Sequence, residues 1–313
     1  MHRNHGSAIV IHQRGAALLI FLLIGVIAAL SLMLNHLGPR TNTSGKQSTI
    51  QALAQAKDAI IGWSASHSTT PGMLPCPEDI TLIGNPNKEG QAQSGCSDTS
   101  PSVGRLPWRT LKIPQLLDDA GEPLWYAVSP GFRSPSKING SSLGQLAIDG
   151  SPNSVVAVIF SPGPPLAGQN RTIPTPALPP DIAQYLEGYD LSGKGSFISS
   201  GAANLFNDRL LTITRDEFFR VVDRRILSEL RGDEGSGLIS YYSDTGAFPP
   251  EGSDLSSIFP SLLSTAATNF MSNNNWYSLL TYSVSTDLQK ATLVINAPSA
   301  MTCTITPSQS TCQ

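Results

Sequence analysis

Four cysteines are the first residues of this 313-residue chain whose type and spacing could support chemistry. A zinc site needs thiolates at short, finger-like spacing or histidine partners, and none of these cysteines lies in a C-x-x-C pair or close to a histidine. An even number of cysteines in an exported chain favours disulfides instead. Three pairings are formally open, and the simplest, Cys76 with Cys96 and Cys303 with Cys312, closes two short loops.

The five histidines do not suggest a catalytic site. Catalysis by a Ser–His–Asp or Cys–His arrangement needs a positioned imidazole. His2, His5 and His12 lie in the first 15 residues, His36 follows an apolar run, and His67 lies at the end of a predicted helix. No glycine-rich loop of a phosphate-binding kind is present. We therefore expect no enzymatic activity, no cofactor and no metal.

Three carboxylates lie close together at Asp118, Asp119 and Glu122. Paired carboxylates can act on glycosidic bonds, but these three are interleaved with Gly121 and Pro123, which favour a turn. The aromatic and β-branched residues that follow, from Trp125 onward, are typical of a strand. We interpret the carboxylates as turn residues.

Composition limits the remaining function classes. A net charge of −3 with only 14% charged residues gives no basic surface for nucleic acid. The chain contains 27 glycines and 24 prolines, so loops and short strands should dominate. Apolar residues make up 40% of the chain, which is enough to bury a core.

An uncharged apolar run extends from Ala16 to Leu34, directly after Arg14 and Gly15. At about 1.5 Å per residue, such a helix can just cross a bilayer core of roughly 30 Å. A cleaved secretory signal has a shorter apolar region followed by small residues, whereas this run ends in Asn35-His36-Leu37-Gly38-Pro39. The basic leader predicts a cytoplasmic N-terminus and an external remainder.

The Arg14-Gly15-Ala16 junction resembles the signal of type IV prepilins. The resemblance implies that a membrane-bound prepilin peptidase cuts between Gly15 and Ala16 and that the new amine of Ala16 is methylated. The helix would then hold the protein in the inner membrane and later pack against other subunits in a fibre. Most pilins carry Glu at the fifth mature position, where this chain has Ile20. That departure suggests a minor subunit at the fibre tip.

The segment after the apolar run also resembles this family. Gly38 to Thr49 is polar and is predicted to interrupt the helix or form a neck, and Ile50 to Ser66 is predicted to be an amphipathic helix. The stretch from Asp118 to Tyr126 resembles the D-x-x-G-x-P-x-x-Y segment of type II secretion pseudopilins. Their calcium loop is not carried over, because Ser161 to Asn170 contains no carboxylate.

The second half of the chain repeats this order. Ser154 to Phe160 is predicted to be a buried strand, and Asp216 to Arg231 an amphipathic helix. We place Phe218, Phe219, Val222, Ile226, Leu227 and Leu230 on its apolar face, and Arg215, Arg220, Asp223 and Arg224 on its polar face. Trp276-Tyr277 and Ala291 to Ile295 then match Trp125-Tyr126 and the first strand. Either the second half duplicates the first without its membrane helix, or two α+β segments align by chance.

The predicted fold class is α+β: a pilin-like membrane helix continuing into a helix on a small antiparallel sheet, with a second α+β unit. We assign residues 1–15 to a leader, 16–37 to the assembly helix, 38–200 to a periplasmic domain and 201–313 to a second domain. The predicted function is that of a minor pilin or pseudopilin in a type IV pilus or type II secretion pseudopilus, acting in assembly, secretion or adhesion. Its partners would be other subunits, the prepilin peptidase and the inner membrane, and no nucleic acid. The alternative is a signal-anchored periplasmic binding protein or enzyme.

Overall fold

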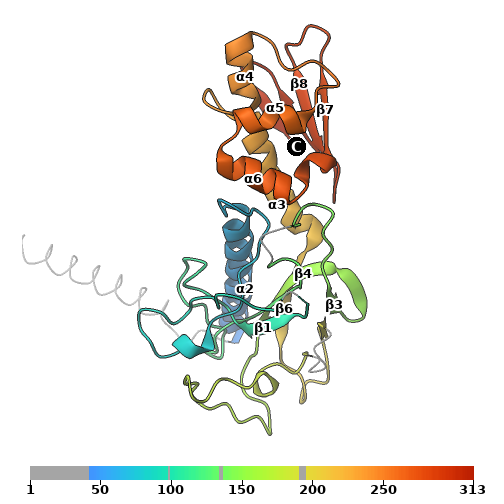
Figure 1. Ribbon diagram of the computed structural model, residues 1–313. Coiled ribbons are helices and arrows are strands. Elements are labelled where there is room, and N and C mark those ends of the chain that lie inside the picture. The colour runs from blue at the N-terminus through green and yellow to red at the C-terminus, as the bar shows by residue number, and fades with distance from the viewer. Residues whose placement is uncertain (1–41, 98, 134–136, 190–194) are drawn as a thin grey trace, which may run out of the picture. The chain divides into compact units, whose positions relative to one another are not determined.

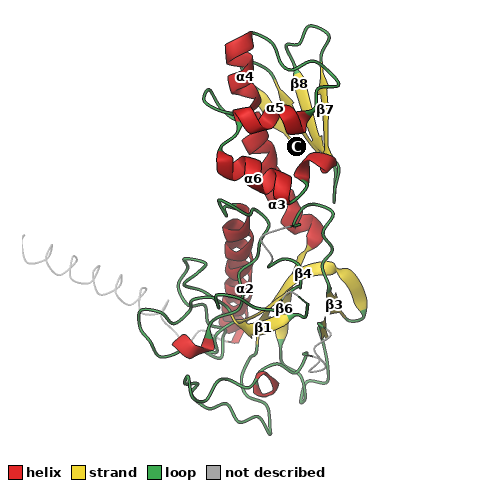
Figure 2. Cartoon of the chain, viewed as in Figure 1, coloured by secondary structure: helices red, strands yellow, loops and turns green. Residues whose placement is uncertain are grey.

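The computed structural model describes residues 42–313 except 98, 134–136 and 190–194 (Figure 1). The described chain is a mixed α+β fold of helices and mainly antiparallel sheets, as the sequence predicted (Figure 2). Residues 48–313 form one compact unit.

The first described element is helix α2, Asn42–Ala65. Its second part confirms the predicted helix over 50–66, and Leu53, Ala56, Ile60 and Ile61 of the predicted apolar face are buried, whereas Ile50 and Ala54 are exposed. The prediction of an interruption up to Thr49 was wrong from Asn42 onward. No proline follows Pro39 before the helix, so every backbone N–H needed for the helical bonds is available.

A six-stranded sheet lies at the centre of the first region. Its strands are β1 (Ser102–Arg105), β2 (Trp125–Val128), β3 (Leu146–Ile148), β4 (Ser151–Ser161), β5 (Ser196–Phe197) and β6 (Arg209–Thr214). The strand order is β1-β2-β4-β3-β5, with β6 also paired to β4, and every pairing except β3 with β5 is antiparallel. The short helices η1 (Ile80–Leu82) and η2 (Ile182–Gln184) lie in the loops.

Both faces of this sheet are buried, which explains the continuous apolar run in β4. Tyr126 and Ile159 belong to a core that also includes residues of α2, whereas Trp125 and Phe160 belong to a second core with Tyr185. A strand covered on both faces loses the polar alternation of a half-exposed strand. The predicted strand over 154–160 is therefore confirmed within the longer β4.

Helix α3, Arg215–Arg231, follows β6 directly and confirms the predicted helix over 216–231. The Thr214 hydroxyl caps its start by accepting from the Glu217 N–H at 3.3 Å. Gly232 ends it with φ +69°, a conformation that glycine adopts without steric cost. Lys57 of α2 donates to the Thr212 carbonyl at 2.9 Å and pairs with Glu217 at 2.7 Å.

The second region contains three further helices and a four-stranded antiparallel sheet, shown beside one another in Figure 1. The elements are α4 (Gly237–Thr245), α5 (Leu255–Leu262), α6 (Thr265–Asn273), η3 (Trp276–Leu279), β7 (Leu280–Val284), β8 (Ala291–Ile295), β9 (Met301–Ile305) and β10 (Ser310–Cys312). The strands pair in chain order as a meander. Alternate residues of β8 and β9 are buried in a core that includes side chains of α3 and α6.

The two halves match only in part. The strand predicted at Ala291 to Ile295 is β8, but Trp276-Tyr277 begins the 3₁₀ helix η3, whereas Trp125-Tyr126 lies in β2. The duplication and the boundary at residue 200 stay predictions.

A polar contact joins a loop of the first region to the end of α6. The buried Asn274 side chain accepts from the Ile138 N–H at 2.8 Å, and its carbonyl accepts from Asn139 Nδ2 at 2.6 Å. A Cβ on Gly140 would lie 1.9 Å from the Ala297 carbonyl oxygen, so the backbones touch there.

Candidate functional site

The predicted processing site, Gly15 and Ala16, and the departure at Ile20 lie outside the described residues. Among the helices that the structure describes, none combines the length and the apolar character needed to cross a bilayer. The predicted assembly helix, residues 16–37, lies outside the described residues, so this finding does not bear on it.

Both disulfides of the simplest connectivity are present, Cys76–Cys96 and Cys303–Cys312, and every cysteine is paired. The second bridge joins directly opposed residues of β9 and β10. The first closes a longer loop, whose Cα atoms at Cys76 and Cys96 are 5.9 Å apart. Each bridge thus fixes one region of the molecule.

The loop between Cys76 and Cys96 is held to the body of the protein by buried polar contacts. The Glu78 carboxylate accepts from the Gly90 N–H at 2.7 Å, and burial raises the pKa of Glu78. Gly90 has φ +84°, and a Cβ there would lie 2.2 Å from the Trp108 ring. Arg109 lies over the same ring at 4.7 Å and donates to the Glu89 carbonyl at 2.8 Å. The loop is therefore an ordered surface.

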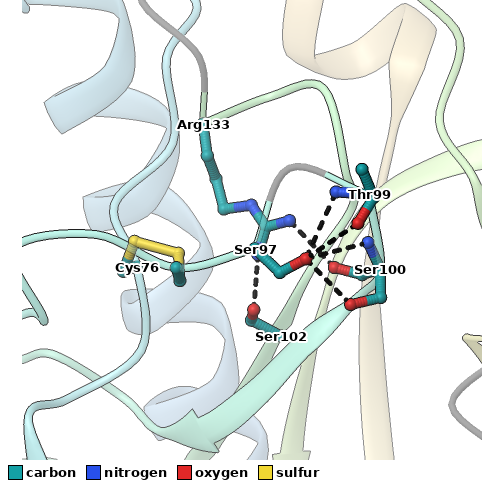
Figure 3. The surroundings of a disulfide bond; sticks show 7 residues. Cys76, Ser97, Thr99, Ser100, Ser102 and Arg133 are labelled. Atoms are coloured by element: carbon teal, nitrogen blue, oxygen red, sulfur yellow. Dashed lines mark hydrogen bonds between the residues drawn. A yellow bond between two sulfur atoms is a disulfide. The ribbon is translucent and has the colours of Figure 1, made fainter.

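Polar residues on the other side of Cys96 continue this surface (Figure 3). The Arg133 guanidinium donates to Ser102 Oγ and to the Ser100 carbonyl, the latter at 2.9 Å. The Ser97 hydroxyl accepts from the Thr99 and Ser100 N–H groups at 3.3 and 3.2 Å. A hollow of about 410 Å³ lies beside the disulfide and is lined by Trp63, Met73 and Arg133 among others. The described residues here form an ordered polar surface beside the disulfide.

Asp118 organises the predicted turn. Its Oδ1 accepts from the Ala120 and Glu122 N–H groups, each at 2.9 Å. Its Oδ2 accepts from the Ser161 hydroxyl at 3.0 Å and the Gly163 N–H at 2.8 Å. Four donors of the protein therefore surround the Asp118 carboxylate, and both of its oxygens accept hydrogen bonds that hold the fold. This confirms turn chemistry for Asp118, while Glu122 lies 3.4 Å from Arg171 and Asp119 lies 3.9 Å from Arg209.

Arg171 holds the segment from Ser161 to Asn170 through its guanidinium group. This guanidinium donates to the Gly163 carbonyl at 2.6 Å and to the Gln184 carbonyl at 2.7 Å, and lies 3.4 Å from Glu122. It also stacks over Tyr185 at 4.9 Å. In the described parts of the chain, no group of three His, Cys, Asp or Glu residues is placed to hold a metal ion.

The connector after Arg171 presents apolar side chains to solvent. Ile173 is 88% exposed and Leu178 is 53% exposed, although Thr175 and Leu178 bridge each other through two backbone bonds at 3.0 Å. Single exposed apolar side chains of this kind are common on protein surfaces and do not by themselves mark a contact site.

Two buried carboxylates lie outside these features. Asp208 accepts from the Gly188 N–H at 2.9 Å, and burial raises its pKa. Asp223, predicted on the polar face of α3, is only 1% exposed, which corrects that prediction. No hydrogen bond or ion pair to its carboxylate is found within the described chain, and burial raises its pKa to about 8. Helical spacing from Phe219, Ile226 and Leu227 was the signal that could have located it inside.

Of the five histidines, the structure describes only His67. His67 follows α2, and its Nδ1 accepts from the Thr70 N–H at 3.2 Å. Its ring packs edge-on against Trp63 at 5.1 Å, and burial lowers its pKa.

No family model, curated protein or solved structure matches this chain.

Proposed function

We propose that this protein is a minor pilin or pseudopilin, anchored in the inner membrane and incorporated in, or capping, a type IV pilus or type II secretion pseudopilus. The observation that carries the proposal is the Arg14-Gly15-Ala16 junction, followed by an uncharged apolar run to Leu34. A lone basic leader would suit any signal anchor, but a glycine directly between the basic residue and the apolar run suits prepilin processing.

Three features of the described chain support the proposal. Helix α2 begins soon after the apolar run and buries one face in the core of an antiparallel sheet. The segment Asp118 to Tyr126 enters that sheet through a turn organised by Asp118. Both disulfides suit an oxidising compartment such as the periplasm.

Ile20 and the size of the external part favour a rare subunit over one that fills the fibre. A carboxylate buried among packed apolar helices is stable only with a partner charge. A subunit with Ile20 at this position needs no such partner charge. A large external domain is accommodated most easily at a tip, where no subunit follows.

The mature N-terminus tests the proposal. Mass spectrometry of the protein from cells with a prepilin peptidase should find a chain that begins at Ala16 with a methylated amine. Gly15→Leu should retain residues 1–15, while the matched control Gly25→Leu, inside the apolar run, should be cut normally. An intact residue 1, or a cut after residue 35, would overturn the proposal and leave the signal-anchored binding protein as the better hypothesis.

A further inference from the structure

The buried carboxylate of Asp223 lies at a pocket between α3 and the segment that leads into β9. The pocket encloses about 210 Å³, whereas a single water needs about 10–15 Å³. Its lining residues include Arg220, Asp223, Arg224, Ser299, Met301 and Gln313. Met301 and Asp223 are buried and form the floor, while both arginines are exposed at the mouth.

Asp223 has no structural explanation within the fold. A buried carboxylate without a donor costs several kcal/mol in its charged form, and Asp118 shows that this protein surrounds a structural carboxylate with four donors. Burial raises the pKa of Asp223 to about 8, so the free pocket holds a neutral acid at pH 7. A group in this state is a common feature of binding and catalytic sites.

The charges of the pocket are ordered from floor to mouth. The arginine ion pairs along α3 in the described chain involve Arg215 and Arg225, which leaves Arg220 and Arg224 available to a ligand. Asp216 also lines the pocket, but it is exposed and its carboxylate pairs with Arg215 at 3.5 Å; the segment 298–301 contributes no charged side chain. A ligand that is positive at one end and negative at the other matches this order.

We propose that this pocket binds a small dipolar ligand of the amino-acid class, with its ammonium group on Asp223 and its carboxylate on Arg220 and Arg224. On binding, the ammonium donates to the Asp223 carboxylate, and the proton that Asp223 held passes to solvent. The volume admits only a ligand of a few heavy atoms, and the site is independent of fibre assembly.

Calorimetry on the full chain in detergent, with L-alanine as the probe, tests the proposal. We expect one site per chain, with affinity rising about fivefold between pH 7 and pH 8, because the deprotonated fraction of Asp223 rises by about that factor across this range. Asp223→Asn should bind at least tenfold more weakly and lose this pH dependence. Asp58→Asn, the same change on the exposed side of α2, should bind as the parent does.

Acetate and ethylamine each carry one half of the dipole and should bind at least tenfold more weakly than alanine. Arg224→Gln should weaken alanine but leave ethylamine unchanged. Acetate binding as tightly as alanine, and more weakly at higher pH, would identify an anion pocket and overturn the proposal. If none of the three probes binds, the pocket holds only water and the proposal is overturned. If Asp223→Asn binds alanine as tightly as the parent does, the proposal is overturned too.

Discussion

Two parts of the molecule, the turn at Asp118 and the helix α3 that carries Asp223, treat a buried aspartate in opposite ways. Asp118 in the first region is 6% exposed and accepts four hydrogen bonds. Asp223, on the helix that packs against the second sheet, is 1% exposed and accepts none within the described chain. Burial therefore does not by itself mark a functional carboxylate. The donors around it separate a structural residue from a candidate binding residue.

The largest effect should come from removing the satisfied carboxylate. Asp118→Ala leaves four donors facing an empty space, and we expect a loss of about 4–5 kcal/mol in the free energy of unfolding, because each unsatisfied buried donor costs about 1–3 kcal/mol before water returns. Guanidinium unfolding of the full chain in detergent measures it. Asp119→Ala, whose carboxylate lies 3.9 Å from Arg209, is the neighbouring control and should cost under about 1 kcal/mol. Equal losses would show that the turn, and not the donor set, is what matters.

Removing the unsatisfied carboxylate of Asp223 should instead raise the free energy of unfolding. Burial raises the pKa of Asp223 from 3.8 to about 8, so the folded protein holds a proton that the unfolded chain releases between these values. Stability then falls as pH rises across that window. Asp223→Asn should remove this fall and raise the free energy of unfolding by about 2–4 kcal/mol at pH 7, with little change near pH 3.

Unfolding curves of parent and Asp223→Asn at several pH values provide the measurement. Asp58→Asn should follow the parent at every pH, since Asp58 is exposed. A gain that does not vary with pH would contradict the role of burial in setting the charge of Asp223.

The same pair of aspartates shows how far sequence alone could lead. The role of Asp118 was predictable in part, because two of its donors lie within four residues in a Gly- and Pro-containing turn. Its other two donors, Ser161 and Gly163, come from the far end of β4, and only the fold brings them close. Asp223 was assigned by residue type to the polar face, although its spacing places it with Phe219 and Ile226 on the buried one. The prediction followed the residue type of Asp223 and not its helical spacing, and it was therefore wrong.

Helices and strands, too, were predicted where the sequence signal is local and missed where it is not. Long periodic segments such as α3 and the apolar run of β4 were predicted within a few residues, because their patterns are set locally. The start of α2 at Asn42 was missed, since a polar Gly-containing stretch was taken for a break although no proline enforces one. The pocket could not be predicted, because its two walls, α3 and the segment 298–301, are far apart in the chain.

The two disulfides allow a second comparison, between the first region and the four-stranded sheet. The Cys76–Cys96 bridge closes a 20-residue separation and Cys303–Cys312 closes one of 9. Loop entropy predicts that Cys76→Ala with Cys96→Ala costs about 3 kcal/mol and the second pair about 2.5 kcal/mol. Guanidinium unfolding measures both double variants. A larger loss for the second pair would show that packing of the buried Cys303 outweighs loop closure.

The smallest expected effect is the difference in coupling energy between two ion pairs that involve α3. Lys57 pairs with Glu217 at 2.7 Å and also donates to the Thr212 carbonyl, so it links α2 to both β6 and α3. Arg225 and Glu229 pair within one turn of α3 itself. A double-mutant cycle with Lys57→Met and Glu217→Gln should give a coupling of about 0.5–1 kcal/mol, because the additional hydrogen bond to the Thr212 carbonyl holds the lysine in place. The cycle on Arg225 and Glu229 should give about 0.3–0.5 kcal/mol. Both couplings should shrink in 1 M salt, and a larger value for the second pair would show that the extra hydrogen bond of Lys57 does not strengthen its ion pair.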